Sequence, residues 1–170
     1  EINAAAWDGF IFQNGRLTTN ASGAGVYLRQ NGTIRNSIIR NDTIVTNAGS
    51  VYGGGVYMNY GTLENCEIYG NYLRYNGTNS YYTYGGGVYV TYGTLIDCDI
   101  HDNRVNNTYS TSYSQGGGVW MKYGTMTGCN IHNNTTNGQG GGIYVSSNSS
   151  STRTMITNCR FENNTAYEGG

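Results

Sequence analysis

Apolar and polar positions alternate in short runs that recur along the chain at nearly constant spacing. Each run follows a glycine-rich phrase, and the five runs are Val26-Tyr27-Leu28, Val56-Tyr57-Met58, Val88-Tyr89-Val90, Val119-Trp120-Met121 and Ile143-Tyr144-Val145. Alternation with a period of two indicates a β-strand that buries one face. No copy contains a helical pattern of about ten residues, so the pattern favours an all-β fold over helical repeats.

Three further inward positions follow each run in the same order. The first comes after a Gly-Thr turn and comprises Ile34, Leu63, Leu95, Met126 and Met155. The second is a cysteine, with a serine in the first copy: Ser37, Cys66, Cys98, Cys129 and Cys159. The third comprises Ile39, Ile68, Ile100, Ile131 and Phe161. A sequence period of about 30 residues predicts a stack of equivalent coils.

The fold that satisfies this pattern is a right-handed parallel β-helix. Coils of short strands, stacked about 4.8 Å apart, would bury equivalent residues in columns, and crossover rules favour right-handed winding. We expect one domain over residues 1–170, with about five to six coils of three short strands and no obvious caps. The coils would start near residues 23, 53, 85, 116, 140 and 169. Segments 43–52, 72–84, 104–115 and 135–139 vary in length and are expected to be projecting loops, with a separate insertion at 146–153.

Asparagines and cysteines recur at equivalent positions of the repeats and predict two further columns. An asparagine ladder, Asn71, Asn103, Asn134 and Asn164 with Asp42 in an earlier copy, follows each cysteine or Ser37 by the same interval. We expect these residues to adopt left-handed backbone and to hydrogen-bond along the stack. The cysteine column is expected to hold free buried thiols, because Ser37 shows that a small side chain suffices; disulfides and a metal site stay open as alternatives.

These phrases carry a family resemblance. The Gly-Gly-Gly-Val/Ile-Tyr phrases and the segment Asp8-Gly9-Phe10-Ile11-Phe12 resemble bacterial right-handed β-helix surface proteins, in particular pectate-lyase-like solenoids and polymorphic outer-membrane repeats. The resemblance implies the fold. It implies no single activity, because lyases, hydrolases, adhesins and inert stalks share this architecture.

Composition narrows the possible partners. Charged residues make up 11% of the chain, the net charge is −1, and Lys122 is the single lysine. A nucleic acid partner is therefore not expected, nor is a membrane span, since no apolar run approaches about 20 residues. No cofactor is expected either. The chain begins at Glu1 rather than Met, so we expect a processed or excised segment of an extracellular or cell-surface protein.

Aromatic residues form two candidate binding columns. Tyr27, Tyr57, Tyr89, Trp120 and Tyr144 are expected to point outward from one strand column, with Tyr60, Tyr92 and Tyr123 beside them. An exposed strip of this kind would suit carbohydrate or another protein. The alternative is that the rings stabilise the sheet by contacting one another.

Few residues are candidates for catalysis, metal binding or glycosylation. Asp97, Asp99 and Asp102 form the densest acidic group, but their surroundings resemble an ordinary polar face, so the sequence leans against an enzyme. His101, His132 and Glu162 fall in one column and are weak metal-ligand candidates, with chance stacking as the alternative. The sequons at Asn76, Asn106 and Asn148 are possible glycosylation sites.

The two ends of the repeat suggest a function. Gly169-Gly170 followed by Glu1-Ile2-Asn3-Ala4 of another copy would imitate the internal Gly-Gly-x-Val-Tyr-Met phrase, while Phe10, Phe12 and Phe161 extend the core columns. Uncapped β-helix ends favour pairing with another chain, and unlike ends propagate as a filament. The leading hypothesis is thus a structural solenoid that assembles head to tail from copies of itself. The alternatives are a fragment of a longer adhesin or carbohydrate-binding stalk and, less favoured, a polysaccharide lyase or hydrolase.

Overall fold

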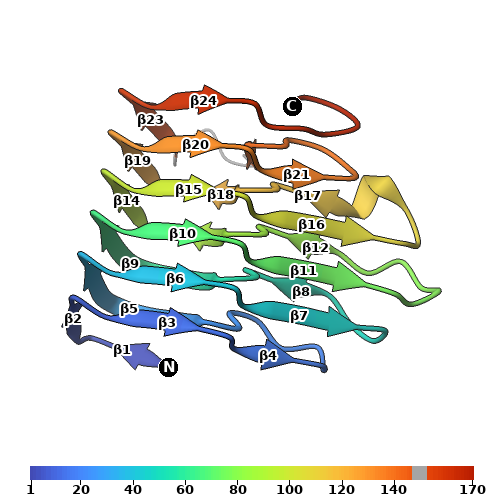
Figure 1. Cartoon of the computed structure of the whole chain (residues 1–170), viewed down its shortest axis with the longest axis horizontal. Coiled ribbons are helices and arrows are strands. Elements are labelled where there is room, and N and C mark those ends of the chain that lie inside the picture. The colour runs from blue at the N-terminus through green and yellow to red at the C-terminus, as the bar shows by residue number, and fades with distance from the viewer. Residues whose placement is uncertain (147–152) are drawn as a thin grey trace.

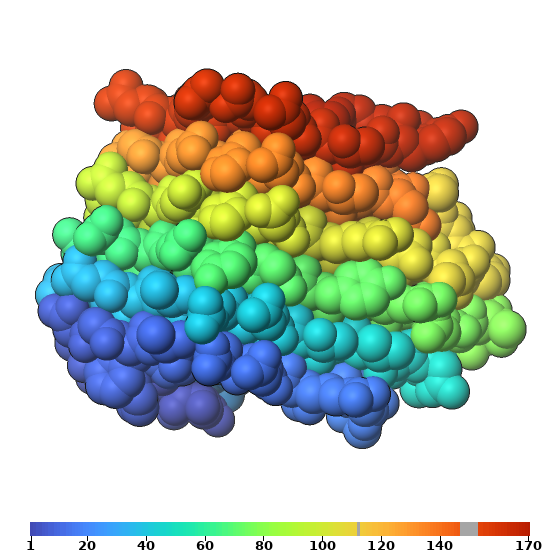
Figure 2. All heavy atoms as spheres, in the orientation of Figure 1, coloured from blue at the N-terminus to red at the C-terminus, as the bar shows by residue number. Residues whose placement is uncertain are grey.

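The computed structural model describes residues 1–146 and 153–170. The described chain winds into coils that stack in sequence order from the N-terminal to the C-terminal end (Figure 1). Space-filling shows the coils as successive layers, with residues near the N-terminus at one end and residues near the C-terminus at the other (Figure 2). Strands from successive coils pair in parallel and build four sheets, here called A to D.

Sheet A is the largest and has ten strands. They are β1 (Ile2–Asn3), β2 (Ala6–Asp8), β5 (Val26–Arg35), β9 (Val56–Glu64), β13 (Val88–Thr91), β14 (Thr94–Ile96), β18 (Val119–Lys122), β19 (Thr125–Thr127), β22 (Ile143–Val145) and β23 (Met155–Thr157). Sheet B has six strands, β3 (Ile11–Gln13), β6 (Ile38–Arg40), β10 (Glu67–Tyr69), β15 (Asp99–His101), β20 (Asn130–His132) and β24 (Arg160–Glu162).

Two smaller sheets complete the coils. Sheet C contains β4 (Arg16–Leu17), β7 (Thr43–Thr46), β11 (Tyr72–Tyr75), β16 (Arg104–Asn107) and β21 (Thr135–Thr136). Sheet D contains β8 (Val51–Tyr52), β12 (Thr83–Tyr84) and β17 (Ser114–Gln115), and a short 3-10 helix, η1 (Thr111–Tyr113), precedes β17. The coil that spans residues 85–115 therefore carries five strands rather than the expected three.

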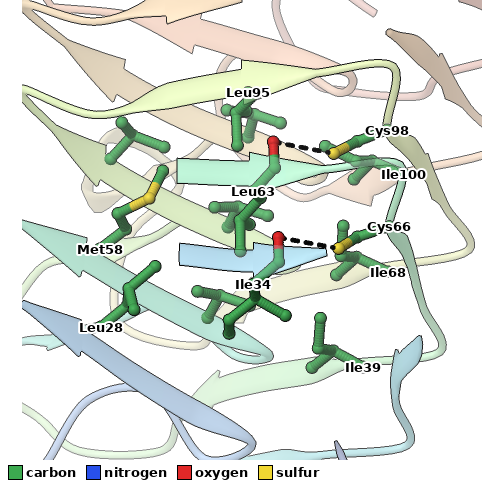
Figure 3. Packing of buried hydrophobic residues seen from close by; sticks show 14 of the residues in the cluster. Leu28, Ile34, Ile39, Met58, Leu63, Cys66, Ile68, Leu95, Cys98 and Ile100 are labelled. Carbon is green, nitrogen blue, oxygen red and sulfur yellow. Dashed lines mark hydrogen bonds between the residues drawn. The ribbon is translucent and has the colours of Figure 1, made fainter. Parts of the chain in front are cut away.

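The core consists of columns that run along the stack. The leucine column comprises Trp7, Ile34, Leu63, Leu95, Met126 and Ile156. The cysteine column comprises Phe10, Ser37, Cys66, Cys98, Cys129 and Cys159. The isoleucine column comprises Phe12, Ile39, Ile68, Ile100, Ile131 and Phe161. Leu63, Leu95, Ile68 and Ile100 have no exposed surface, and Figure 3 shows them packed between neighbouring coils.

The expectation of projecting loops at 43–52, 72–84, 104–115 and 135–139 is wrong. These segments contain strands of sheets C and D that pair in register, and they bury a second apolar cluster of Ile44, Val51, Leu73 and Val105. The apolar signal is diluted there, because buried polar side chains share the inward positions: Thr46, Thr83, Asn107, Ser114 and Thr136. Alternation of apolar with small polar residues on an inward face weakens the periodicity on which strand assignment relies.

The assignment of Met155 to the inward column is also wrong. β19 pairs with β23 so that Met126 faces Ile156, and Met155 lies opposite the outward-facing Thr125. The inward residue of this column lies three residues before the cysteine of its coil, as Met126 does before Cys129 and Ile156 before Cys159. The insertion before β23 changes the distance from the preceding glycines, so the cysteine marks the register here and Met155 lies one residue too early.

The asparagine ladder forms hydrogen bonds as expected but not through left-handed backbone. The residues with positive φ immediately precede the ladder and are Asn41 (58°), Gly70 (64°), Asp102 (53°), Asn133 (54°) and Asn163 (52°). The sharp corner is thus made one residue earlier. This leaves each ladder side chain free to point inward between coils.

Candidate functional sites

The asparagine ladder joins coil to coil through buried amides. Asn103 donates a hydrogen bond from Nδ2 to the Ile68 carbonyl at 2.9 Å and another to Asn134 Oδ1 at 3.0 Å. The backbone N–H of Asn103 donates to the same oxygen at 3.0 Å. Asn71 and Asn134 repeat the arrangement with the neighbouring coils. These side chains are saturated with structural hydrogen bonds, so the ladder stabilises the stack.

Asp42 occupies the first internal position of this ladder. Its Oδ1 accepts a hydrogen bond from the Gly15 N–H at 2.7 Å, and its own N–H donates to Asn71 Oδ1 at 3.0 Å. The second oxygen, Oδ2, is buried and has no hydrogen-bond partner. Burial raises the pKa of Asp42 from 3.8 to about 7, although the Gly15 hydrogen bond opposes the shift.

A cluster of histidines and carboxylates lies on the outer face of sheet B. The Nε2 atom of His132 lies 3.0 Å from Asp99 Oδ1, in the coil below. His101 contacts Glu67 Oε1 through Nε2 at 3.2 Å and Asp102 Oδ2 through Nδ1 at 2.8 Å. The two imidazoles stack with ring centroids 4.8 Å apart. The register of β10, β15 and β20 therefore interleaves acidic and imidazole side chains on successive coils.

Burial and hydrogen bonding shift the pKa of His101 in opposite directions. Burial lowers the pKa of His101, but its hydrogen bonds with Asp102 and Glu67 outweigh burial, so the net direction is upward. The stacked ring of Tyr69, with its centroid 4.9 Å from that of His101, covers the other face of the imidazole.

The sequence-predicted acidic and metal candidates are only partly brought together. Asp99 and Asp102 join the histidines, whereas Asp97 lies in a turn with φ of 49°, next to Gly128 of the following coil. Glu162 pairs with Arg160 at 2.7 Å. Asp99 instead forms the group with His101 and His132 in which one ligand atom from each residue lies within 4.8 Å of the others. The metal candidates predicted from the sequence include Glu162, whereas the structure places Asp99 beside the two histidines.

Two hollows on the described surface do not involve these carboxylates. One is lined by Thr111, Gly138, Gln139, Tyr167 and Glu168, and the other by Thr18, Val45, Thr46, Asn47 and Asn76. Asp97, Asp99 and Asp102 stay weak catalytic candidates that the structure places on a sheet face and its adjoining turns.

Four rings of the larger aromatic column, those of Tyr27, Tyr57, Tyr89 and Trp120, stack face to face. Ring centroids are 4.5 Å apart for Tyr27 and Tyr57, 5.1 Å for Tyr57 and Tyr89, and 4.6 Å for Tyr89 and Trp120. Trp120 is 6% exposed and is also covered by Tyr84. The expected exposed strip is therefore half-buried, because sheet D adds tyrosines beside it. Ring faces already occupied by neighbours are not open for stacking on sugars, which favours the structural role of these residues.

The second column lies at a corner and is more exposed. Tyr60, Tyr92 and Tyr123 have φ of 55°, 55° and 57°, in the left-handed region that bulky residues rarely occupy. Tyr60 and Tyr92 stack with centroids 4.9 Å apart, and Lys122 lies over the ring of Tyr123. Stacking across coils offsets backbone strain at each position.

The remaining predicted positions are placed as follows. Cys66, Cys98 and Cys129 are buried and free, and Cys159 is free and partly exposed. Their thiols lie against backbone carbonyls, with Cys66 Sγ 3.5 Å from the Ile34 oxygen (Figure 3). Asn76 is exposed and Asn106 is half-buried in β16, while Asn148 lies outside the described residues. No helix in the described part of the chain is long and apolar enough to cross a bilayer.

The two end faces expose apolar side chains. Phe10 is 46% exposed and packs with Trp7 and Phe12, with ring centroids 5.0 Å and 6.0 Å away. At the opposite end, Phe161 is 43% exposed and Ile156 is 36% exposed. Ile2 pairs with Leu28, so it lies two residues further along the strand than the expected match to the Gly-Gly-x-Val phrase.

Parallel pairing in register, coil upon coil, defines the molecule as a parallel β-solenoid. A family model described as a right-handed beta helix region matches residues 2–169, and the chain belongs to this family. No curated protein and no solved structure matches the chain. The pectate-lyase-like and outer-membrane-type affiliations stay predictions.

Proposed function

We propose that this protein is a non-catalytic structural solenoid of the cell exterior whose copies stack end to end. One observation carries the proposal. In the described chain, every large apolar side chain that is markedly exposed, tyrosines apart, lies in the first or last coil: Phe10, Ile11, Val145, Met155, Ile156 and Phe161. Concentrated exposed apolar surface marks an interaction site.

The two faces match each other column by column. A second copy placed one coil spacing beyond β23 and β24 sets its Trp7 on Ile156, because both belong to the leucine column. It likewise sets Phe12 on Phe161 in the isoleucine column. In the cysteine column, Phe10 meets the small side chain of Cys159, so a large ring faces a small group. This match supports a second copy as the occupant.

Backbone pairing supports the same arrangement. The strands β2 and β3 pair on one side only, with β5 and β6, and β23 and β24 pair on one side only, with β19 and β20. Stacking would place β2 on β23 and β3 on β24 as parallel pairs, which is the mode of strand addition at exposed sheet edges. Since the two faces differ, the contact is head to tail and extends into a filament.

The register shows how the composite coil would close. Gly140 donates a hydrogen bond to the Glu168 carbonyl and Gly141 to the Gly169 carbonyl, which aligns Gly170 with Gly141. Val145 and Ile2 share the column of Leu28 and Met121. Two strand positions, those of Gly142 and Ile143, therefore have no counterpart between Gly170 of one copy and Glu1 of the next. The two copies are not covalently joined, so no backbone has to span these two missing positions.

The test compares the association of the 170-residue chain with that of two aspartate variants. Phe161→Asp places a charge in the centre of one end face, and Tyr109→Asp places one at a similarly exposed site away from it. Burying one phenylalanine contributes roughly 1.5–3 kcal/mol. Sedimentation velocity over a concentration series should show association weakened at least tenfold by Phe161→Asp and unchanged by Tyr109→Asp. Negative-stain microscopy should show rods.

Two results would overturn the stacking proposal. One is a monomer throughout the concentration series, which would favour the alternative of a longer adhesin or stalk whose own coils cover these faces. The other is an equal effect of the two aspartate variants, which would place the contact elsewhere on the surface.

A further inference from the structure

The outer face of sheet B gathers metal-ligating atoms at one step of the stack. Asp99 and His101 are the outward-facing residues of β15, and in β20 the outward-facing His132 pairs with His101. We propose that these three side chains form a surface site for a divalent transition-metal ion, with Zn²⁺ as the reference ion. Two imidazoles and one carboxylate are a donor set that this class of ion prefers.

The spacing of the ligand atoms is close to what such an ion requires. With metal–ligand bonds near 2.1 Å, tetrahedral ligand atoms lie about 3.4 Å apart. His132 Nε2 and Asp99 Oδ1 are already 3.0 Å apart, and all three ligand atoms lie within 4.8 Å of one another. Since 4.8 Å is the upper bound for these distances, the ligand atoms must close by at most about 1.4 Å to bind the ion. The proposal requires this movement from the His101 side chain, whose ring stacks between those of Tyr69 and His132.

Electrostatics also favour a cation at this position. Glu67 and Asp102 contact the His101 imidazole, and Asp99 contacts the His132 imidazole, at distances of 3.2, 2.8 and 3.0 Å. With neutral histidines, the cluster carries the negative charge of three carboxylates. The contact between His132 Nε2 and Asp99 Oδ1 lies where the ion would bind, so the ion would replace the proton that this pair shares. His101 would give up its contact with Glu67 or with Asp102 to free a nitrogen for the ion.

Neighbouring coils lack this donor set. Along the histidine column the equivalent residues are Gln13, Arg40, Tyr69 and Glu162, so no other step has two imidazoles. Along the Asp99 column they are Ile11, Ile38, Glu67, Asn130 and Arg160. Asn130 holds the Asp99 carboxylate, since its Nδ2 donates a hydrogen bond to Asp99 Oδ1 at 3.2 Å. Its Oδ1 is buried and has no hydrogen-bond partner. The site is thus confined to the step between the coils of β15 and β20.

The experiment is a Zn²⁺ titration by calorimetry in a buffer that does not bind metal. All proteins carry Cys159→Ser, because a partly exposed thiol is a competing zinc ligand. The test variants are His101→Gln and His132→Gln, and glutamine suits this column because Gln13 occupies it naturally. The control is Glu162→Gln, which changes the next residue in the same column and lies outside the ligand group. Circular dichroism verifies that each variant retains the fold.

We expect one Zn²⁺ per chain, at least tenfold weaker binding for each histidine variant, and less than threefold change for Glu162→Gln. Addition of Co²⁺ should selectively broaden the NMR signals of both imidazoles in the Cys159→Ser protein. Absence of saturable binding would overturn the site. So would one ion per two chains, a loss caused by Glu162→Gln, or binding that His101→Gln leaves unchanged. These measurements use a lateral face and do not depend on end-to-end stacking.

Discussion

Asp42 is an acid in a position that the fold fills with asparagine. It lies in the asparagine ladder, where the equivalent side chains are Asn71, Asn103 and Asn134. A Cβ built on Gly25 would lie 2.1 Å from Asp42 Oδ2, just as a Cβ built on Gly87 would lie 2.8 Å from Asn103 Nδ2. The unpartnered Oδ2 therefore occupies the place of an amide nitrogen. We predict that Asp42→Asn stabilises the protein.

The new Nδ2 would regain both bonds of the ladder. In Asn103, this atom donates to a carbonyl of the preceding coil and to the side-chain oxygen of the following ladder residue. The equivalent acceptors for residue 42 are the Phe12 carbonyl, by the pairing of Phe12 with Ile39, and Asn71 Oδ1. Two buried hydrogen bonds contribute about 1–3 kcal/mol.

The carboxyl group adds a pH-dependent contribution. Its pKa rises from 3.8 to about 7 on folding. Each pKa unit corresponds to about 1.4 kcal/mol, so a shift of about three units costs the wild type up to about 4 kcal/mol. Because the folded state holds the proton more tightly, stability is fully present below pH 3.8, falls as the pH rises through about 7, and is level above that.

Guanidinium unfolding at pH 4, 5, 6, 7 and 8 tests this reasoning. The stability difference between Asp42→Asn and wild type should be about 1–3 kcal/mol at pH 4, from the two hydrogen bonds, and should widen by up to about 4 kcal/mol at pH 8. Asn71→Asp provides the reverse change one coil further on and should lose stability with rising pH. Stability curves for Asp42→Asn and wild type that run parallel from pH 4 to 8 would refute the assignment of a buried, destabilising carboxyl group.

Two further predictions concern the corner tyrosines and the thiols. Tyr92→Val should destabilise by about 1–2 kcal/mol, since a β-branched residue is strained at a φ of 55°. Tyr92→Gly should stay within about 1 kcal/mol of wild type, because the released strain offsets the lost stacking; equal losses for both variants in thermal melts would contradict this account. A thiol reagent should label Cys159 first in the native protein, although burial raises the pKa of Cys159. Labelling should slow as protein concentration rises if end-to-end stacking covers this thiol; mass spectrometry of the labelled peptides measures both effects.

The columns of sheets A and B could be predicted because each inward position repeats as an apolar residue or cysteine. The cysteines are the most useful marker, since one occurs in each of the last four coils and fixes the register of Ile68, Ile100 and Ile131. Sheets C and D escaped detection because inward threonine, asparagine and serine interrupt the apolar pattern there. Hydrogen bonds such as that between Ser114 and Thr136, at 2.8 Å, satisfy those buried groups only once the coils are stacked.

The candidate sites were harder to predict for a geometric reason. Sequence position places a residue in a column but does not give the direction in which its side chain leans. Asp99 leans across to His132 of the next coil, whereas Glu162 turns toward Arg160 of its own strand. The aromatic column was likewise assigned correctly as a column, but the contacts between ring faces and the cover from Tyr84 depend on sheet D.

The glycines that precede each sheet A strand, such as Gly54, Gly86 and Gly117, stack at one corner of the solenoid and give successive coils the same backbone contact there. A Cβ on Gly54 would lie 2.2 Å from the Gly86 carbonyl, and a Cβ on Gly86 would lie 2.3 Å from the Gly117 carbonyl. Every coil that meets this corner with glycine presents the same backbone to the coil before it and the coil after it. Duplication or deletion of one coil in the gene would therefore preserve the backbone contacts at this corner, so that molecular length can change in evolution by whole coils.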